Sequence, residues 1–292
     1  MTRFRKHLVM LVALGLAPAF AAQLGTFTVI DYPGAKTTIA FGINDAGDVV
    51  GSYTDQQKST HGFLQRAGKF TTLDFPGAGY TTAYRVNGGG DVLGAYRDSS
   101  SKMHGFLLRG GAFKILNDFP GAESTIPVGL NSRGDVAGMY ILPGDKKHYG
   151  FVMTGGRFTT IDHSLPNDMS CALGMNDSGQ IAGHVREING TYRGYLWKDG
   201  KFTLIEVPGA SKGQMWDSVI EINAAGDMVG AYSDAGGKQR AYLLRKGSLT
   251  PFDAPGSQRT RASGINRSGQ IVGMFEDSNG VAHGFLTRVT PR

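Results

Sequence analysis

Short runs of Val, Ile, Thr, Phe and Tyr, with partial alternation of apolar and polar positions, recur along most of the chain. Gly, Asn, Asp and Pro separate these runs. Beta-branched and aromatic residues at a period of two are typical of half-buried strands. The first four runs cover Thr38–Asn44, Asp48–Thr54, His61–Arg66 and Lys69–Phe75. Outside the N-terminal segment no stretch sustains a helical period, so the pattern predicts an all-β protein.

One turn motif recurs at an interval that matches four short strands. It reads Asn-x-x-Gly followed by Asp or Gln, and its copies begin at Asn44, Asn87, Asn131, Asn176, Asn223 and Asn266, at intervals of 43, 44, 45, 47 and 43 residues. A fixed period of this length is the signature of repeat architectures. Gly at the fourth position suits a hairpin that needs positive φ, and the Asn side chain can hydrogen-bond the backbone that follows it. The chain therefore contains six copies of one four-stranded unit.

Two further motifs mark the units. His-Gly-Phe-Leu begins at His61, His104 and His283, and in the other three copies the histidine is replaced by Tyr149, Arg193 and Arg240. Asp-Phe-Pro-Gly and its variants begin at Asp31, Asp74, Asp118, Glu206 and Asp253. Together with Ile-Asn-x-x-Gly-Asp-Val-Val-Gly, the His-Gly-Phe-Leu signature resembles the HAF-repeat family of extracellular bacterial proteins. The resemblance covers the whole chain after the N-terminal segment and implies export and repetition, but it brings no activity and no catalytic residues.

The two ends of the repeat region carry complementary fragments of the unit. The sixth unit stops after a third strand at Ala282–Val289, and the region opens with a fourth strand at Thr26–Asp31. Pairing them would complete a sixth sheet and hide both edges, whereas the terminal repeats of a linear solenoid would look like caps. The sequence therefore predicts a six-bladed β-propeller of four-stranded blades, closed by pairing of the N-terminal and C-terminal strands. A solenoid and a pair of sandwich domains are the alternatives.

The N-terminal segment has the layout of a signal peptide. Arg3, Arg5 and Lys6 precede an apolar stretch at Leu8–Phe20, and Ala-Phe-Ala at residues 19–21 matches the small-x-small pattern of signal peptidase sites. The stretch is too short to span a bilayer comfortably; a membrane anchor or a buried first helix is the alternative. We predict a signal peptide at residues 1–21 and a single propeller domain at residues 22–292. This domain would be exported to the periplasm or the extracellular space as a monomer without a membrane span.

Charge and cysteine content narrow the function further. The formal net charge is +6, and three of these cations belong to the N-terminal segment. The remaining charges are scattered, whereas nucleic-acid binding needs a concentrated basic patch, so that class is excluded. Cys171 is the only cysteine, which leaves no internal disulfide. It stands where the first unit has Ile39, and we interpret it as a small buried hydrophobe rather than a catalytic thiol.

The repeated polar residues invite three chemical interpretations that the pattern disfavours. Acidic turn residues suggest calcium loops, but Gln replaces Asp in two copies: Asp48, Asp91, Asp135, Asp227, Gln180 and Gln270. The histidines of the His-Gly-Phe-Leu motif suggest a metal ring, but a third strand is not innermost, and we expect hydrogen bonds within or between blades. The carboxylates of the Asp-Phe-Pro-Gly motif recur in every unit, whereas a single catalytic site needs only one set of acid and base residues. These carboxylates are interpreted as structural for that reason. We therefore predict no catalytic residue, no metal site and no cofactor.

Departures from the repeat are the places where function can show. If the first strand of each unit is innermost, the loops that enter it surround one mouth of a central channel. The departures there are Tyr80, Arg85, Trp216, Asp217, Glu221, Arg259 and Arg261. Arg85 and Glu221 stand where the other four units have Gly. An aromatic residue beside charged groups is typical of sugar or peptide contact surfaces; neutral drift of loops is the alternative.

These observations favour an exported binding or interaction module for a carbohydrate or protein partner. A propeller enzyme, such as a lyase or hydrolase acting on polysaccharide or a small ester, is one alternative. It would need two or three titratable groups converging in one pocket, and the sequence offers only scattered candidates. A structural protein of the cell envelope is the other alternative.

Overall fold

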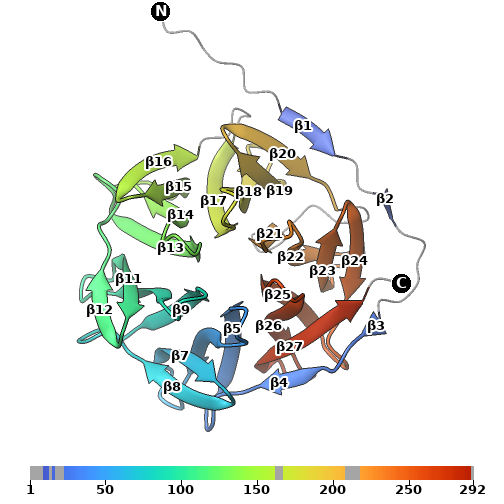
Figure 1. The fold of residues 1–292 in the computed structure, drawn as a ribbon, viewed down its shortest axis with the longest axis horizontal. Helices are drawn as coiled ribbons and strands as arrows, with labels where there is room; N and C mark the ends of the chain where they lie inside the picture. The colour runs from blue at the N-terminus through green and yellow to red at the C-terminus, as the bar shows by residue number, and fades with distance from the viewer. Residues whose placement is uncertain (1–8, 13–14, 17–22, 162–166, 208–217, 291–292) are drawn as a thin grey trace, which may run out of the picture.

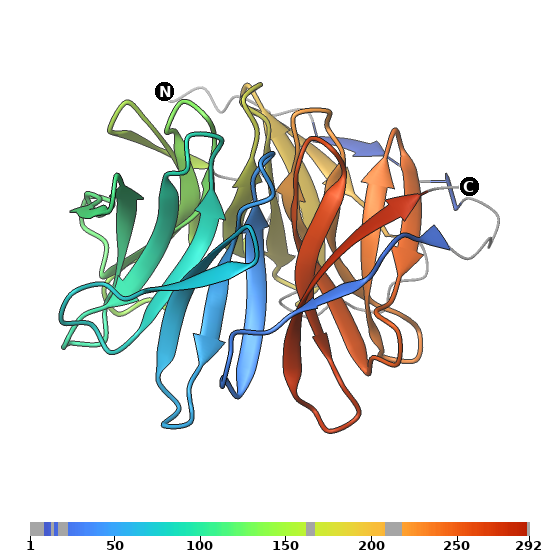
Figure 2. The same cartoon turned by 60° about the horizontal axis from the view of Figure 1, so that its bottom comes forward.

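The computed structural model describes residues 9–12, 15–16, 23–161, 167–207 and 218–290. They form six antiparallel sheets arranged around a central axis (Figure 1). Figure 2 shows the hairpin turns gathered at the two ends of this ring. The architecture is the predicted six-bladed β-propeller. Over the described residues, no helix is long and apolar enough to cross a membrane.

In blades 1 to 5 the four strands of the repeat follow chain order from the axis outward (Figure 1). Blade 1 consists of β5 (Thr37–Ile43), β6 (Val49–Thr54), β7 (Thr60–Arg66) and β8 (Lys69–Leu73). Blade 2 consists of β9 (Thr81–Val86), β10 (Val92–Arg97), β11 (Met103–Arg109) and β12 (Ala112–Ile115). Blade 3 consists of β13 (Ser124–Leu130), β14 (Val136–Ile141), β15 (Tyr149–Thr154) and β16 (Arg157–Ile161). Blade 4 consists of β17 (Asn167–Met175), β18 (Ile181–Glu187), β19 (Tyr192–Lys198) and β20 (Lys201–Ile205). Blade 5 consists of β21 (Ser218–Ile222), β22 (Met228–Ser233), β23 (Gln239–Arg245) and β24 (Ser248–Phe252).

Blade 6 joins the two ends of the chain. It consists of β25 (Arg259–Ile265), β26 (Gln270–Glu276), β27 (Ala282–Thr290) and, as its outer strand, β4 (Thr28–Ile30). In the antiparallel register Ile30 lies opposite Gly284 and Thr28 opposite Leu286. The short strand β3 (Gln23–Leu24) pairs with the end of β27. The predicted pairing of the N-terminal and C-terminal strands is therefore confirmed.

Part of the segment predicted as a signal peptide also pairs with the ring. Strand β1 (Val9–Val12) runs parallel to β20, and β2 (Gly15–Leu16) runs parallel to β24 (Figure 1). Both lie on the outer edges of blades 4 and 5. Cleavage after residue 21 would leave those edges as they are in blades 1 to 3, where the fourth strand is outermost.

The repeat motifs correspond to packing requirements inside and between blades. The aromatic residue of the His-Gly-Phe-Leu motif is fully buried in every blade: Phe63, Phe106, Phe151, Tyr195, Tyr242 and Phe285. A Cβ at Gly51 would lie 2.7 Å from the Phe63 ring and 2.0 Å from the Ile39 carbonyl oxygen, so the second strand needs Gly there. The aromatic residue of Asp-Phe-Pro-Gly reaches the next blade, where Phe75 stacks on Tyr96 with ring centroids 3.7 Å apart.

The Asn turn joins blades as well as strands. The Asn44 side-chain oxygen accepts hydrogen bonds from the backbone N–H groups of Ala46 and Asp48, which closes the hairpin. Its amide nitrogen donates to the Asn87 carbonyl oxygen of the next blade, at 3.2 Å. Asn266 donates to the Asn44 carbonyl oxygen across the seam, at 3.0 Å. The turn interpretation of this motif is therefore correct, and the motif also contributes to ring closure.

Candidate functional site

A β-bulge in the first strand of every blade shapes the central channel. In blade 1, Ala40 and Gly42 pair with consecutive residues of β6, so that Phe41 has no partner. The same register shift occurs in the other five blades, and the bulged residues are Tyr84, Val128, Leu173, Ile220 and Ser263. A bulge re-aims the side chain of its extra residue. All six bulged residues line one cavity at the axis.

This axial cavity has a volume of about 420 Å³, within the range of roughly 300–1,000 Å³ that small-ligand sites occupy. Its wall is mainly apolar. Residues before the bulges, such as Ile39 and Ile126, complete the wall, and Tyr80, Arg259 and Arg261 also line it. No Asp or Glu of the described residues lines the cavity. The site therefore combines an aromatic and aliphatic wall with guanidinium groups.

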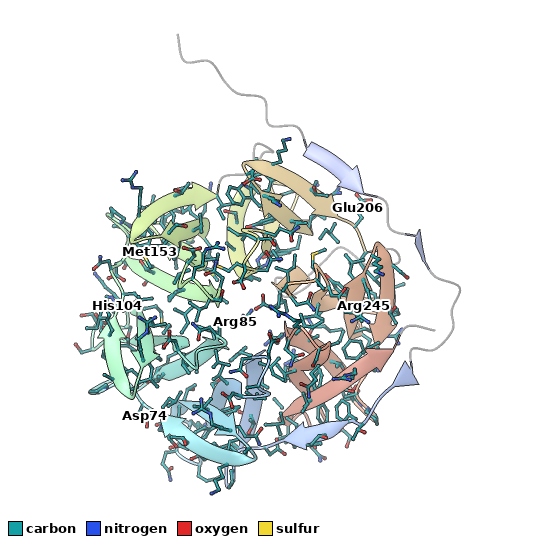
Figure 3. All side chains as sticks on the ribbon, in the orientation of Figure 1. Asp74, Arg85, His104, Met153, Glu206 and Arg245 are labelled. Atoms are coloured by element: carbon teal, nitrogen blue, oxygen red, sulfur yellow. The ribbon has the colours of Figure 1, made fainter. Side chains whose placement is uncertain are left out.

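Arg85 and Glu221 meet on the axis, where Arg85 forms the floor of the cavity. Arg85 lies at the centre of the ring (Figure 3), and its Nε forms an ion pair with a Glu221 carboxylate oxygen. Both side chains are buried, with 6% and 9% of their surface exposed. The remaining guanidinium nitrogens donate to carbonyl oxygens of Phe41, Tyr84, Leu173 and Ile220, at 2.8–3.3 Å. One side chain thus contacts the first strands of four blades.

The glycines at the equivalent position leave space at the axis, and Gly174 makes room for the ion pair itself. A Cβ at Gly174 would lie 2.5 Å from the Glu221 carboxylate, and one at Gly42 would lie 2.7 Å from the Tyr84 carbonyl oxygen. Burial raises the pKa of Glu221, and the Arg85 guanidinium opposes that rise. Arg85 and Glu221 were predicted as ligand contacts, and in the structure they form an ion pair with each other. Arg85 still lines the cavity, but as its floor.

The other predicted contact residues have different positions. Tyr80 lines the cavity, and the Arg97 guanidinium lies 4.8 Å from its ring centre. Arg261 also lines it; burial lowers the pKa of its guanidinium to about 10, so that it stays protonated at neutral pH. Arg259 lies at the rim and pairs with Glu276. The predicted contacts Trp216 and Asp217 lie outside the described residues.

Several cavity residues escaped sequence reasoning. Phe41 and Tyr84 are bulged residues of the first strands, to which the sequence pattern assigned no role. His148 and Met139 come from blade 3 and also line the cavity. The recurrent Gly after the bulge is the one sequence signal that marks the position. From the sequence, this Gly position served to single out Arg85 and Glu221, which replace the Gly. The six bulged residues that directly precede the position and line the cavity were not identified.

The axial ion pair separates this cavity from a second one at the opposite mouth. That cavity has a volume of about 340 Å³ and is lined by the six Asn turns, with Asp45, Asp177 and Arg267 at its border. Its asparagine side chains already bond the backbone, as described above. We therefore place the candidate site at the mouth that contains Arg261.

The repeated His and Asp residues are structural. His61 lies 2.9 Å from Asp74 and 3.3 Å from Asp55, and His104 contacts Asp118 and Asp98 in the same way. Figure 3 shows Asp74 and His104 at the periphery of the ring. Arg193 and Arg240 form the equivalent ion pairs with carboxylates in blades 4 and 5. The predicted hydrogen bonds are therefore confirmed, and they lie within single blades.

The acidic turn residues are matched by arginines. Asp48 pairs with Arg66 at 3.0 Å, and Asp227 pairs with Arg245 at 2.8 Å. The Arg66 hydrogen bond lowers the pKa of Asp48 against the opposing effect of burial. The carboxylates of Asp48 and Asp227 thus form ion pairs with arginines, which agrees with a structural role in the turn.

The fold recurs in solved structures of low sequence identity. A protein of unknown function from Dyadobacter fermentans superposes with a TM-score of 0.60 at 9% identity, over 92% of this chain and 100% of the other. A lectin of Aleuria aurantia, in complex with Fucalpha1-6GlcNAc, gives 0.56 at 8% identity, over 88% and 95%. A gluconolactonase from Xanthomonas campestris gives 0.53 at 12% identity, over 94% and 99%. At such identities the likeness shows the fold alone. No family model and no curated protein matches the sequence.

Proposed function

We propose that this protein is an exported binding module that takes an acidic carbohydrate in the axial cavity. The carrying observation is the composition of that cavity: an apolar, partly aromatic wall with Arg261 and Arg259, and no carboxylate among the described lining residues. Aromatic rings pack against the apolar faces of sugars, and a guanidinium binds a carboxylate with two parallel hydrogen bonds. The lectin among the structural neighbours makes a sugar ligand compatible with the fold.

The enzymatic alternatives have less support. Acid–base chemistry on a glycoside or an ester needs titratable groups that converge on a bound substrate. The candidate carboxylate Glu221 is held by Arg85 below the cavity floor. Burial lowers the pKa of His148, and no Asp or Glu lines the cavity beside it among the described residues. The arginine and aromatic side chains of the cavity can bind a sugar without any such arrangement of titratable groups.

Calorimetric titration with oligogalacturonate and with a neutral oligosaccharide of equal length tests the proposal. We expect the acidic sugar to bind, and Arg261→Gln to weaken its binding at least about tenfold, because a charge-assisted bond is lost. Trp216→Ala should also weaken binding, as its position in the loops before the first strand suggests. Arg267→Gln is the matched control, because Arg267 borders the opposite cavity and its side chain is 70% exposed.

Two outcomes would contradict this function. One is equal affinity for the neutral and the acidic oligosaccharide. The other is a loss of affinity in Arg267→Gln as large as that in Arg261→Gln. The export part of the proposal has its own test, since the secreted protein should begin at Ala22 when its N-terminus is sequenced.

A further inference from the structure

Three soft side chains lie together in the wall of the axial cavity, where blades 3 and 4 meet. Cys171 is on β17, Met139 is on β14, and His148 precedes β15. The Cys171 sulfur lies 3.6 Å from the Met139 sulfur and 3.8 Å from Nδ1 of His148. From the sequence we interpret Cys171 as a buried hydrophobic residue. In the fold, its sulfur lies next to two atoms that can bind a metal, the sulfur of Met139 and Nδ1 of His148.

These separations match those of ligands that share one metal ion. A metal binds thiolate sulfur at about 2.3 Å and imidazole nitrogen at about 2.0–2.1 Å. In tetrahedral or trigonal geometry such bonds leave the ligand atoms roughly 3.5–4 Å apart, which follows from those bond lengths. The Cys171 distances to Met139 and His148 lie in this range. The positions of Met139 and His148 relative to the Cys171 sulfur are therefore compatible with one shared ion.

A second histidine beside the cluster has unused nitrogen atoms. His184 lies directly opposite Cys171 in the β17–β18 pair, and directly opposite residues project from the same face of a sheet. Its side chain is 1% exposed, and neither ring nitrogen has a hydrogen-bond partner among the described residues. A buried polar group without a hydrogen-bond partner is destabilising and calls for an explanation. Burial lowers the pKa of His184 to about 4, so its ring is neutral and retains a free lone pair at neutral pH.

The donor set selects the type of ion. Across the described residues, no three His, Cys, Asp or Glu side chains gather closely enough to hold a metal, so the thioether of Met139 is essential to the cluster. A thiolate and a thioether are the ligands that monovalent copper prefers, whereas magnesium and calcium take oxygen ligands. The negative thiolate would balance a single positive charge inside the apolar wall. Met139 and His148 line the cavity, which gives the ion a path inward.

We propose that Cys171, Met139 and His148 bind one monovalent copper ion, with the buried, unpartnered His184 beside the cluster. Copper displaces the thiol proton of Cys171 when it binds, because the thiolate is the ligand. The site does not depend on the acidic carbohydrate, because copper would bind inside the wall between two blades and the sugar in the open cavity.

The test is an anaerobic titration of the purified chain with Cu(I), in competition with a chromogenic copper chelator. We expect one bound ion per chain, with sulfur ligands in the copper X-ray absorption spectrum. Cys171→Ser should abolish this binding, and Met139→Leu should weaken it at least about tenfold, because a sulfur ligand is removed at nearly constant volume. Met153→Leu is the matched control: Met153 is a buried methionine of β15 that packs away from the cluster.

A Cys171→Ser variant that retains the copper stoichiometry of the parent would overturn the proposal. If Cys171→Ser fails to fold, Met139→Leu decides, and equal affinity in Met139→Leu and Met153→Leu would also overturn it. Copper binding should raise the melting temperature of the parent and leave that of Cys171→Ser unchanged. Zinc that competes on equal terms with Cu(I) would contradict the assignment to a soft monovalent ion.

Discussion

Single residues that depart from the repeat have effects across the whole ring. Arg85 and Glu221 replace two of six glycines at one repeat position, and their side chains fill the axis that the other four leave open. A buried ion pair is costly to desolvate, but removing one partner leaves the other charge uncompensated. The pair is therefore expected to stabilise the ring only while both members are present.

Glu221→Ala should lower the free energy of unfolding by about 3–5 kcal/mol, because it leaves the Arg85 guanidinium buried without a counter-charge. The double variant Arg85→Gly/Glu221→Gly should lose less than the sum of the two single glycine variants, because it removes both charges. Urea unfolding measures each value. Glu276→Ala is the control: it removes the partner of the half-exposed Arg259 and should cost less than about 1 kcal/mol. Additive losses at Arg85 and Glu221 would show that the pair is not coupled.

The peripheral histidines give a pH dependence with a definite sign. Partial burial tends to lower the pKa of His61, but hydrogen bonds to Asp74 and Asp55 outweigh it and raise the pKa above 6.5. The pKa of His104 is raised in the same way by Asp98 and Asp118. A raised pKa in the folded state means that the contribution to stability is complete below the unfolded pKa and is lost as pH rises through the folded pKa.

We therefore expect the free energy of unfolding to fall as pH rises above about 6.5, and to fall less in His61→Gln/His104→Gln. His61→Arg/His104→Arg should flatten the profile while retaining the ion pairs, as Arg193 and Arg240 do in blades 4 and 5. Chemical denaturation across this pH range provides the measurement. A profile that is unchanged in the Gln variant would assign the dependence to other groups.

At the scale of the element, the Asn turn combines backbone geometry with side-chain bonding. Gly47, Gly134 and Gly226 adopt φ of +85°, +84° and +84°. Nothing lies within 4 Å of a Cβ built at any of them. A larger side chain there would therefore meet only backbone strain and no steric contact.

Replacement of Gly47, Gly134 or Gly226 by Val should each destabilise the protein by about 1 kcal/mol or more, because a β-branched residue resists positive φ. Gly88→Val is the matched control. Gly88 lies in the same turn of blade 2 and has equally open surroundings, but it is not among the residues with positive φ. Thermal melting should separate the two groups. Equal melting temperatures for Gly47→Val and Gly88→Val would mean that the backbone conformation carries no cost.

At the scale of the whole molecule, the seam holds the ring closed. Strand β4 completes blade 6, and Phe27 packs on Phe285 and Phe275 with ring centroids 5.3 and 5.7 Å apart. Beyond the strand, Tyr32 stacks on Tyr53 of blade 1 at 3.7 Å. A short N-terminal segment therefore joins the last blade to the first, and its loss would expose an unpaired strand edge.

Deletion of residues 22–31 from a chain that begins at Ala22 should abolish or strongly weaken cooperative unfolding, since it removes the outer strand of blade 6. Differential scanning calorimetry of the two chains measures the effect. Removal of residues 22–25 alone is the control and should have a much smaller effect, because it leaves β4 in place. A truncated chain that melts like its parent would show that the seam pairing is dispensable.

The amino-acid sequence by itself determined the number of units, the order of strands and the closure of the ring. Each of these follows from local chemistry. Alternating side chains define a strand, and Gly with positive φ defines a hairpin. The incomplete units at Thr26–Asp31 and Ala282–Val289 each leave one strand edge open, and these two edges pair with each other. Strand bounds were predicted within two residues in blade 1. Two observed strands begin one residue earlier, at Thr37 and Thr60. The residues predicted in strands but lying outside them are Asn44, Asp48, Asp74 and Phe75, whose side chains bond or pack beyond the strand.

The axial cavity and its neighbours were decided by the tertiary structure alone. Arg85 and Glu221 are 136 positions apart in the chain, and no local pattern states that they meet. The bulged residues of all six blades come together around one cavity, and Cys171 meets Met139 only because two blades pack side by side. Contacts at the axis depend on how six separate sheets converge, and this convergence is a property of the closed ring rather than of any one repeat.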